Sequence, residues 1–417
     1  MFSITPVARH AASACVLLAA FGTYAHAGVP LLTWYASTTN TQSSPASVAG
    51  DGIDQALAYN SDGNVSAAQQ YLDDAAAAGV QVILDVGWQN VRVGNLTPVE
   101  TYIRAFADHP ALGGWYLFDE PDELGLSVSE ARAASDLIRS ISVKPIYGAI
   151  DAKRPSTQDA YSETVDRMIT FDYPFDVGDG EFGGTLEANW KSRTATSAAN
   201  ARSNGQQWYN VIQAYGRDGN APDLRLPTKA ELRFMTLYSL VAHDADGVMY
   251  WARYRTTRSD PLPDEPYPLG GLAWLRDVFT PMVDEFEQHY GDAVSAGALA
   301  GAVSTSDPGN IHADVYFDPD KEKYYLLVVN DEGRKINATL SLNLGLALAP
   351  QDLLSIDDGV STFALAGGQV DLSLDAYETQ SFEVRLAPEP TSVGVMLFSG
   401  VLLGFRGSRV VRAGAQI

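Results

Sequence analysis

Two adjacent carboxylates follow one short apolar stretch of the chain. Residues 115–118 read Trp-Tyr-Leu-Phe, aromatic and aliphatic side chains that are typical of a buried strand. Asp119 and Glu120 come next, and Pro121 then breaks the stretch. A carboxyl group that is buried beside aromatic rings has a raised pKa and can act as a general acid. The alternative is a solvated turn, in which the two acids cap the following helix.

The composition limits the classes of function. The chain has 417 residues, 46% of them hydrophobic, which suffices for one domain of about 250 residues and a smaller one. Its net charge of −23, spread along the chain, argues against a nucleic-acid partner and predicts a soluble, extracytoplasmic protein. Because the single cysteine, Cys15, lies near the N-terminus and no His-x-x-x-His pattern occurs, we expect no metal and no cofactor.

The first 27 residues have the pattern of a secretory signal. Arg9 and His10 precede an apolar stretch at 11–21, and Ala25-His26-Ala27 is an A-x-A site for signal peptidase. The stretch is too short to span a bilayer. We therefore expect residues 1–27 to be a signal peptide that is removed on export.

The last thirty residues, 388–417, contain a second signal. Pro388-Glu389-Pro390 is followed by an apolar run at 393–405 and by three arginines up to Arg412. Thirteen apolar residues are few for a span, but a basic flank suits temporary retention at the inner membrane. The layout resembles the PEP-CTERM sorting signal of Gram-negative bacteria. That resemblance implies cleavage by exosortase and delivery to the cell surface or the extracellular (biofilm) matrix; the alternative is a permanent membrane anchor.

Between residues 28 and 290, short apolar strands alternate with helical stretches. Eight such strands are predicted, at 30–35, 53–59, 81–86, 114–118, 144–150, 167–171, 208–213 and 247–251. This alternation predicts an α/β fold, a (β/α)8 TIM barrel, in which the carboxyl ends of the strands form the functional face.

The pattern changes in residues 291–387. Apolar and polar residues alternate with period two in segments separated by turn signals, at 294–304, 312–317, 324–330, 338–344, 368–374 and 379–386. We expect a small antiparallel β-sandwich here, and we expect it to brace the barrel.

The count of strands places the acidic pair at the end of the fourth strand. There the chain resembles clan A of the glycoside hydrolases, which carry an acid/base glutamate after strand four, usually as Asn-Glu-Pro. Asp119-Glu120-Pro121 matches this motif with Asp in place of Asn. The resemblance covers the barrel and fits a C-terminal β-sandwich. It implies that Glu120 protonates the glycosidic oxygen, and we expect Asp119 to orient Glu120 or to bind a sugar hydroxyl.

The second catalytic carboxylate of the clan is missing from its usual position in this chain. The clan places a nucleophilic glutamate at strand seven, where this chain has Gln213, which we expect to contact the substrate instead. Asp172, between aromatic residues after strand six, is the first replacement to consider, although it could instead pair with a nearby arginine. Glu181, in the glycine-rich loop 177–184, is the second. A carboxyl separation of about 5 Å from Glu120 would suit a covalent intermediate, and about 6.5–9.5 Å would leave room for an attacking water.

Aromatic residues cluster at the predicted strand ends. Sugar rings pack their C–H faces on aromatic planes, so these residues are candidates for binding a carbohydrate substrate, although any single one can be core. They are Trp34, Tyr35, Trp88, Tyr173, Tyr215, Trp251 and Tyr254. Trp251 matches a tryptophan that these barrels use as a sugar floor, which suggests a cis peptide after it. Arg253 and Arg255 could bind an anionic substituent or pair with a local Asp.

These observations predict a secreted glycoside hydrolase that cleaves O-glycosidic bonds of a polysaccharide or oligosaccharide. The missing glutamate at strand seven motivates an alternative, a non-catalytic matrix protein that binds glycan with a degenerate hydrolase barrel.

Overall fold

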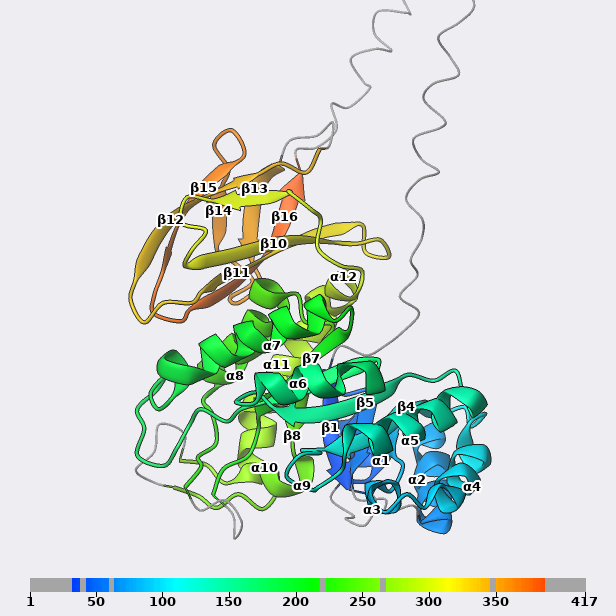
Figure 1. The fold of residues 1–417 in the computed structure, drawn as a ribbon. Coiled ribbons are helices and arrows are strands. Elements are labelled where there is room, and N and C mark those ends of the chain that lie inside the picture. Colours follow the sequence, from blue (N-terminus) through cyan, green and yellow to red (C-terminus); the bar gives the residue numbers. More distant parts are fainter. Residues whose placement is uncertain are drawn as a thin grey trace, which may run out of the picture.

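The computed structural model describes residues 32–37, 43–59, 64–217, 223–262, 268–345 and 350–386. It consists of a closed barrel of eight parallel strands followed by two antiparallel sheets (Figure 1). The predicted signal peptide and the predicted sorting segment lie outside the described residues. In the part of the chain that is described, no helix is both long and apolar enough to cross a membrane.

The barrel strands follow one another around the barrel in chain order, and β8 closes it by pairing with β1. They are β1 (Leu32–Ser37), β2 (Gln55–Tyr59), β3 (Gln81–Asp85), β4 (Leu112–Asp119), β5 (Ile146–Asp151), β6 (Arg167–Phe171), β7 (Gln207–Gln213) and β8 (Gly247–Trp251). Each corresponds to one of the eight predicted strands, so the predicted fold class is confirmed.

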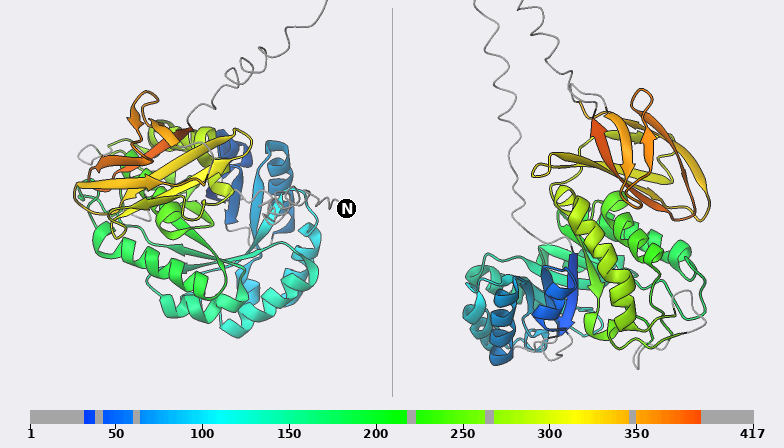
Figure 2. Two further views of the ribbon diagram at one scale, coloured as in Figure 1. Left: turned by 90° about the horizontal axis from the view of Figure 1, so that it is seen from above. Right: turned by 180° about the vertical axis from the view of Figure 1, so that it is seen from behind.

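Helices cover the outside of the barrel (Figure 2). The α-helices of the described residues, including short ones in the loops after the strands, are α1 (Pro45–Gly50), α2 (Val65–Ala78), α3 (Trp88–Arg92), α4 (Leu96–Phe106), α5 (Val128–Ile141), α6 (Pro155–Tyr161), α7 (Lys191–Ser203), α8 (Lys229–Leu237), α9 (Arg253–Thr256), α10 (Gly271–Trp274), α11 (Thr280–Glu285) and α12 (Gly291–Ser295). Capping boxes begin α5, at Ser127 and Glu130, and α8, at Thr228 and Glu231.

Period-two alternation along the strands separates two buried layers. Side chains that point outward pack against the helices, as Trp34 and Trp115 do. Side chains that point inward fill the barrel, among them Tyr35, Tyr116 and Tyr209. A residue's position along its strand therefore decides whether it faces the helices or the barrel axis.

The C-terminal region forms a sandwich of a five-stranded and a three-stranded antiparallel sheet. Its strands are β9 (Val303–Thr305), β10 (Ile311–Asp318), β11 (Lys323–Asn330), β12 (Ile336–Leu342), β13 (Pro350–Ser355), β14 (Thr362–Ala364), β15 (Gln369–Leu374) and β16 (Thr379–Leu386). The prediction was wrong at 294–304, where α12 and two glycines in the left-handed region, Gly297 and Gly301, precede the short strand β9. The sequence pattern also missed β13 and β14.

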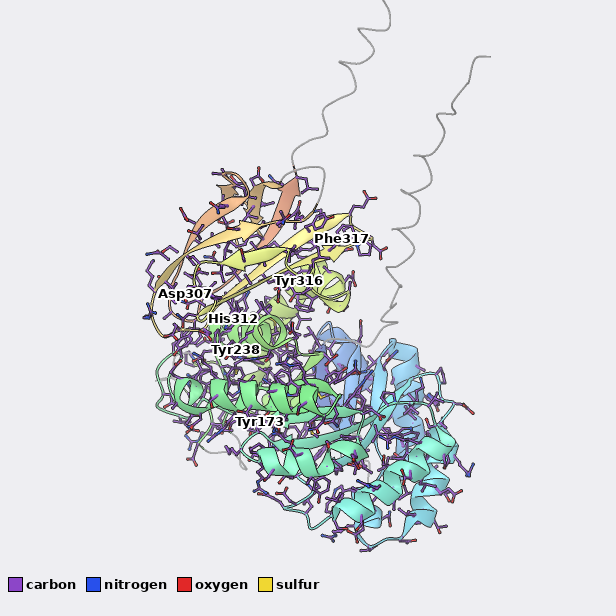
Figure 3. All side chains as sticks on the ribbon, turned by 45° about the horizontal axis from the view of Figure 1, so that its top comes forward. Tyr173, Tyr238, Asp307, His312, Tyr316 and Phe317 are labelled. Atoms are coloured by element: carbon purple, nitrogen blue, oxygen red, sulfur yellow. The ribbon has the colours of Figure 1, made fainter. Side chains whose placement is uncertain are left out.

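The sandwich is fixed to the barrel by buried contacts. Arg233 of α8 donates hydrogen bonds to Thr379 and forms an ion pair with Asp357. Tyr238, in a π-helical turn that continues α8, lies edge-on to His312 of β10, with ring centres 6.0 Å apart (Figure 3). Since sandwich residues such as Leu327 also join the hydrophobic cluster of the barrel, the two parts share one continuous core.

Candidate active site

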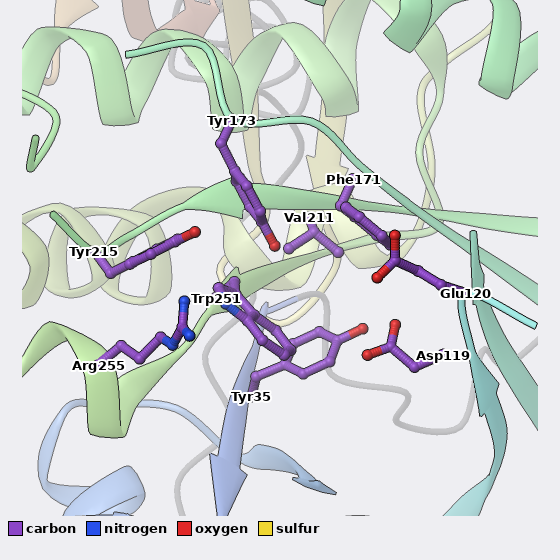
Figure 4. Close-up of a pocket in the computed structure, with 9 residues that line it drawn as sticks. All are labelled: Tyr35, Asp119, Glu120, Phe171, Tyr173, Val211, Tyr215, Trp251 and Arg255. Carbon is purple, nitrogen blue, oxygen red and sulfur yellow. The ribbon is translucent and has the colours of Figure 1, made fainter. Parts of the chain in front are cut away.

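A pocket opens among the carboxyl ends of the barrel strands (Figure 4). In α/β barrels this end of the strands carries the functional groups. The described residues that line the pocket are Tyr35, Asp119, Glu120, Phe171, Tyr173, Val211, Tyr215, Trp251 and Arg255. The pocket thus combines two carboxyl groups, one guanidinium and five aromatic rings.

A bulge in β4 brings Asp119 to the pocket. Tyr116 pairs with Tyr147 of β5 while Phe118 pairs with Gly148, so one extra residue, Leu117, interrupts the alternation. Leu117 and Phe118 both point into the helix layer, and Asp119 then faces the barrel axis. Gly148 leaves room for the Phe118 ring, because a Cβ at that position would lie 2.3 Å from it.

The backbone of Glu120 is left-handed, with φ of 45°. Non-glycine residues seldom adopt this conformation, and it ends the extended strand at this residue. Its amide still donates a hydrogen bond to Ala149 of β5, at 2.9 Å. As a result the side chain of Glu120 lines the same pocket as that of its neighbour.

The environment favours the protonated form of both carboxyl groups. Burial raises the pKa of Asp119 to about 6, and the nearby hydroxyls of Tyr59 and Tyr116 limit the rise. Burial also raises the pKa of Glu120 to about 7, with further contributions from the negative charges of Asp119 and Asp151. Near neutral pH, Glu120 therefore retains a proton that it can donate.

Aromatic rings form the walls around these carboxyl groups. The Trp251 ring lies edge-on to Tyr35, with centres 4.5 Å apart, and Tyr173 lies edge-on to Tyr215 at 5.4 Å. The Trp251–Ala252 peptide bond is cis, as the family resemblance suggests. Flat apolar walls with a few polar groups are suited to a sugar ring.

Asp172 does not reach the pocket. It follows β6 between Phe171 and Tyr173, both of which line the pocket, so the alternation points Asp172 away from it. The buried carboxylate accepts a hydrogen bond from Arg193 of α7 at 2.7 Å and pairs with Lys153 at 3.2 Å. Asp172 thus has the structural role that the sequence left open. Glu181 is exposed in its loop and does not line the pocket either.

Two predicted tryptophans also lie elsewhere. Trp34 is fully buried in the helix layer, with its ring centre 4.4 Å from that of Phe279. Trp88 begins α3, where the guanidinium of Arg92 lies 5.2 Å from its ring centre. The sequence contained a signal for Trp34, because it and Tyr35 are consecutive in a strand and cannot both face the barrel axis.

The side chain of Gln213 forms hydrogen bonds with the backbone of two loops. Its amide oxygen accepts a hydrogen bond from the N–H of Phe175 at 3.0 Å. Its amide nitrogen donates to the carbonyls of Phe175, at 3.0 Å, and Arg225, at 2.8 Å. Gln213 therefore ties the loop after β6 to the loop after β7, and it does not line the pocket that we expected it to reach.

The two arginines after β8 have different environments. Arg253 forms a buried ion pair with Asp51. Arg255 lines the pocket, and its guanidinium carbon lies 5.3 Å from the ring centre of Tyr215. Among the described residues, no group of three or more His, Cys, Asp or Glu side chains is arranged to hold a metal ion.

A parallel eight-stranded barrel with acids and aromatics at its functional face, followed by a β-sandwich, defines the fold class of many glycoside hydrolases. No family model and no curated protein matches this chain.

Solved glycoside hydrolases share its fold. A GH27 β-L-arabinopyranosidase from Geobacillus stearothermophilus aligns with 88% of this chain and 98% of its own, at 12% identity and a TM-score of 0.54. A bifunctional glucanase-xylanase from a metagenome library aligns over 86% and 97%, at 10% identity and 0.52. A noncanonic maltogenic alpha-amylase from Thermotoga neapolitana aligns over 86% and 99%, at 8% identity and 0.51. The chain therefore has a glycoside hydrolase fold.

Proposed function

We propose that this protein is an exported glycoside hydrolase that cleaves O-glycosidic bonds of a polysaccharide or oligosaccharide, with Glu120 as the general acid/base. One observation carries the proposal. A glutamate with a pKa near neutrality stands at the end of the fourth barrel strand, in a pocket walled by aromatic rings.

The two carboxyl groups have different roles, one as proton donor and one as negative charge. Burial raises the pKa of both groups toward neutrality, and the charge of Asp119 raises the pKa of Glu120 further, so the pair holds one proton and one negative charge near neutral pH. Glu120 donates the proton to the glycosidic oxygen as the bond to the leaving sugar breaks. The negative charge of Asp119 stabilises the positive charge that develops on the remaining sugar. A water molecule then adds to that sugar carbon and gives its proton to the deprotonated Glu120, which completes the hydrolysis and restores the acid.

The pocket walls position the sugar for this step. Trp251 and Tyr35 lie on one side of the pocket's centre, with Tyr173 and Tyr215 across from them (Figure 4). A sugar ring packed on these faces would bring its glycosidic oxygen toward Glu120. Asp172 and Gln213 support the site from outside by holding the loop after β6, through Arg193 and through the carbonyl of Phe175.

Release of reducing sugar from a panel of plant and bacterial polysaccharides tests this function. We expect wild-type protein to hydrolyse at least one glycan, and Glu120→Gln to lower the rate at least 100-fold, the low end of a general-acid contribution. Asp172→Asn is the matched control, since it also neutralises one buried carboxylate but outside the pocket. Unchanged hydrolysis in Glu120→Gln would remove Glu120 from the mechanism.

A second candidate function is glycan binding without catalysis. It is favoured by Gln213, whose amide occupies the strand-seven position of the clan's nucleophile. Binding of a glycan by the wild type, with no hydrolysis of any member of the panel, would support this candidate over the first.

The two terminal segments support export as part of the proposal. We infer that signal peptidase cleaves after Ala27 and that exosortase processes the chain near Pro388-Glu389-Pro390, after transient anchoring in the inner membrane. Mass spectrometry of the protein recovered from the cell surface or the matrix tests both cleavages. A chain that retains residues 391–417 there would contradict the second.

A further inference from the structure

Tyr59 is the last residue of β2 and lies next to the lining of the pocket. Leu57, two residues earlier, points into the barrel, and Ala58 points into the helix layer. The alternation therefore turns Tyr59 toward the barrel axis, where its half-buried side chain packs against the inner core. Its place at the carboxyl end of a strand is typical of a functional group in an α/β barrel.

The ring of Tyr59 is held by its neighbours. Its centre lies 5.3 Å from that of Trp251 and 6.3 Å from those of Tyr35 and Tyr116. Tyr35 and Tyr116 are also 6.3 Å apart, so three tyrosines from β1, β2 and β4 form a triangle inside the barrel. Because closely packed rings have few alternative rotamers, the hydroxyl of Tyr59 has a defined position.

That hydroxyl donates a hydrogen bond to the carboxyl group of Asp119. Burial raises the pKa of Tyr59, and the charge of Asp119 raises it further, so the phenol keeps its proton. A hydrogen bond from such a donor favours the charged form of a carboxyl group. Burial raises the pKa of Asp119 to about 6, and the hydroxyls of Tyr59 and Tyr116 keep it from rising further.

The surroundings of Glu120 act in the other direction. Burial raises the pKa of its carboxyl group, and the negative charges of Asp119 and Asp151 raise it further. Arg154, whose charge favours the ionised form of Glu120, forms an ion pair with Asp122. A hydroxyl donor at one carboxyl group and like charges around the other favour a single arrangement, with the negative charge on Asp119 and the proton on Glu120.

Other titratable groups also face Asp119, and Figure 4 shows the Tyr35 hydroxyl pointing toward its carboxyl group. The groups around Asp119 are Tyr35, Tyr59, Tyr116, Tyr173 and Glu120, with Arg255 in the lining of the same pocket and Tyr254 acting on Tyr59. Tyrosine and arginine side chains keep their ordinary charge below about pH 9. Changes of charge around neutral pH therefore belong to the carboxyl groups.

We propose that Tyr59 is a positioning residue that assigns the roles of the two carboxyl groups: its hydroxyl orients the Asp119 carboxylate and stabilises the negative charge there, which leaves the proton on Glu120. The inference rests on the proposed function for what that charge and that proton do in the reaction. It goes further in naming a residue outside the pocket lining on which the division of roles depends.

NMR titration of the Asp119 and Glu120 carboxyl groups in the full-length protein tests the inference without a substrate. Tyr59→Phe removes one oxygen atom and keeps the ring. We expect it to raise the apparent pKa of Asp119 by about one pH unit, as the loss of a hydrogen bond to a charged group should, and to move part of the negative charge to Glu120. Tyr290→Phe is the matched control, since it removes a phenol hydroxyl that donates to Glu285 at 3.0 Å, and it should change neither titration.

Hydrolysis tests the role of Tyr59 in the reaction, with the glycan of the panel that the wild type cleaves fastest. Tyr59→Phe should lower kcat about tenfold and leave KM within about threefold, because Tyr59 does not line the pocket. The loss of activity at low pH should begin at higher pH than in the wild type, since Asp119 ionises later. In an Asp119→Asn background, where the partner is absent, Tyr59→Phe should change kcat by less than about twofold.

Three results would overturn the inference. The first is an unchanged Asp119 titration in Tyr59→Phe at an unchanged melting temperature. The second is an equal loss of kcat in Tyr59→Phe with and without Asp119→Asn, which would mean that Tyr59 supports the fold and not Asp119. The third needs no variant of Tyr59, because it is a wild-type Glu120 that ionises before Asp119.

Failure of the inference and failure of the proposed function give different results. Hydrolysis that is lost in Glu120→Gln but unchanged in Tyr59→Phe would keep the hydrolase and reject the role of Tyr59. A shifted Asp119 titration in Tyr59→Phe, in a protein that cleaves no glycan of the panel, would keep the effect of Tyr59 on Asp119 and reject the hydrolase.

Discussion

Asp119 and Glu120 are consecutive residues whose carboxyl groups line one pocket, although neighbouring residues of a strand point to opposite faces. The bulge at Leu117 turns the first inward, and the left-handed backbone at Glu120 ends the strand before the second. Because the two groups are so close, the charge of Asp119 helps to raise the pKa of Glu120.

Asp119→Asn should therefore lower the pKa of Glu120 from its value of about 7, because one cause of the rise is removed while burial remains. The loss of activity at high pH, where Glu120 deprotonates, should then begin at lower pH. NMR titration of the Glu120 carboxyl measures the shift directly, and kcat/KM against pH measures its effect. An unchanged or higher pKa would show that the two groups do not interact.

Asp172→Asn should lower the free energy of unfolding by about 1–3 kcal/mol, because Arg193 and Lys153 lose their charged partner. Glycan hydrolysis per folded molecule should stay within a few-fold of the wild type. Urea unfolding and the reducing-sugar assay check the two statements. Loss of hydrolysis at full stability would return Asp172 to the mechanism.

Gln213→Glu should destabilise the protein and should not create a nucleophile. A carboxylate cannot donate to the carbonyls of Phe175 and Arg225. The substitution therefore leaves carboxylate oxygens facing these carbonyl oxygens in a buried site. We expect a loss of about 2–4 kcal/mol. Gln369→Glu, at an exposed position of β15, is the control and should change stability little. Improved hydrolysis in Gln213→Glu, measured with the same glycans, would contradict the structural role.

Low pH should destabilise the protein through His243, whose ring centre lies 4.7 Å from that of Tyr238 at the junction between barrel and sandwich. Burial, with the charges of His312 and Arg202, lowers its pKa to about 4 from an ordinary value of 6.5. Between these values the unfolded chain binds more protons than the folded one, so stability falls as pH falls, by up to about 3 kcal/mol. His243→Phe keeps a ring and removes this titration. Stability curves for the two proteins that run parallel from pH 7 to pH 4 would exclude the effect.

Arg233→Met should weaken the same junction by about 3–5 kcal/mol, because it leaves Glu285 and Asp357 without their buried cation. Calorimetry should show the barrel and the sandwich melting less cooperatively. Arg132→Met breaks an exposed pair and should cost less than about 1 kcal/mol. Equal effects of the two substitutions would mean that Arg233 does not hold the junction.

Strand periodicity was enough to predict the fold, because buried parallel strands are short, apolar and separated by amphipathic helices. Predicting the site also required the direction in which each side chain points from its strand. Phe171 and Tyr173 share a face from which Asp172 is excluded, and this follows from the sequence once the strand is placed. The roles of Gln213 and Arg253 could not be predicted from the sequence, because only the folded loops bring their partners Arg225 and Asp51 close to them.

The final described strand and the pocket lie at opposite ends of the molecule. In Figure 1, β16 ends at the top of the sandwich, whereas α9, which directly follows β8, lies at the bottom of the barrel. A protein held to a surface through the end of β16 would point its pocket outward, toward material that arrives from the surroundings. Long polymers could then reach the binding groups without threading past the point of attachment.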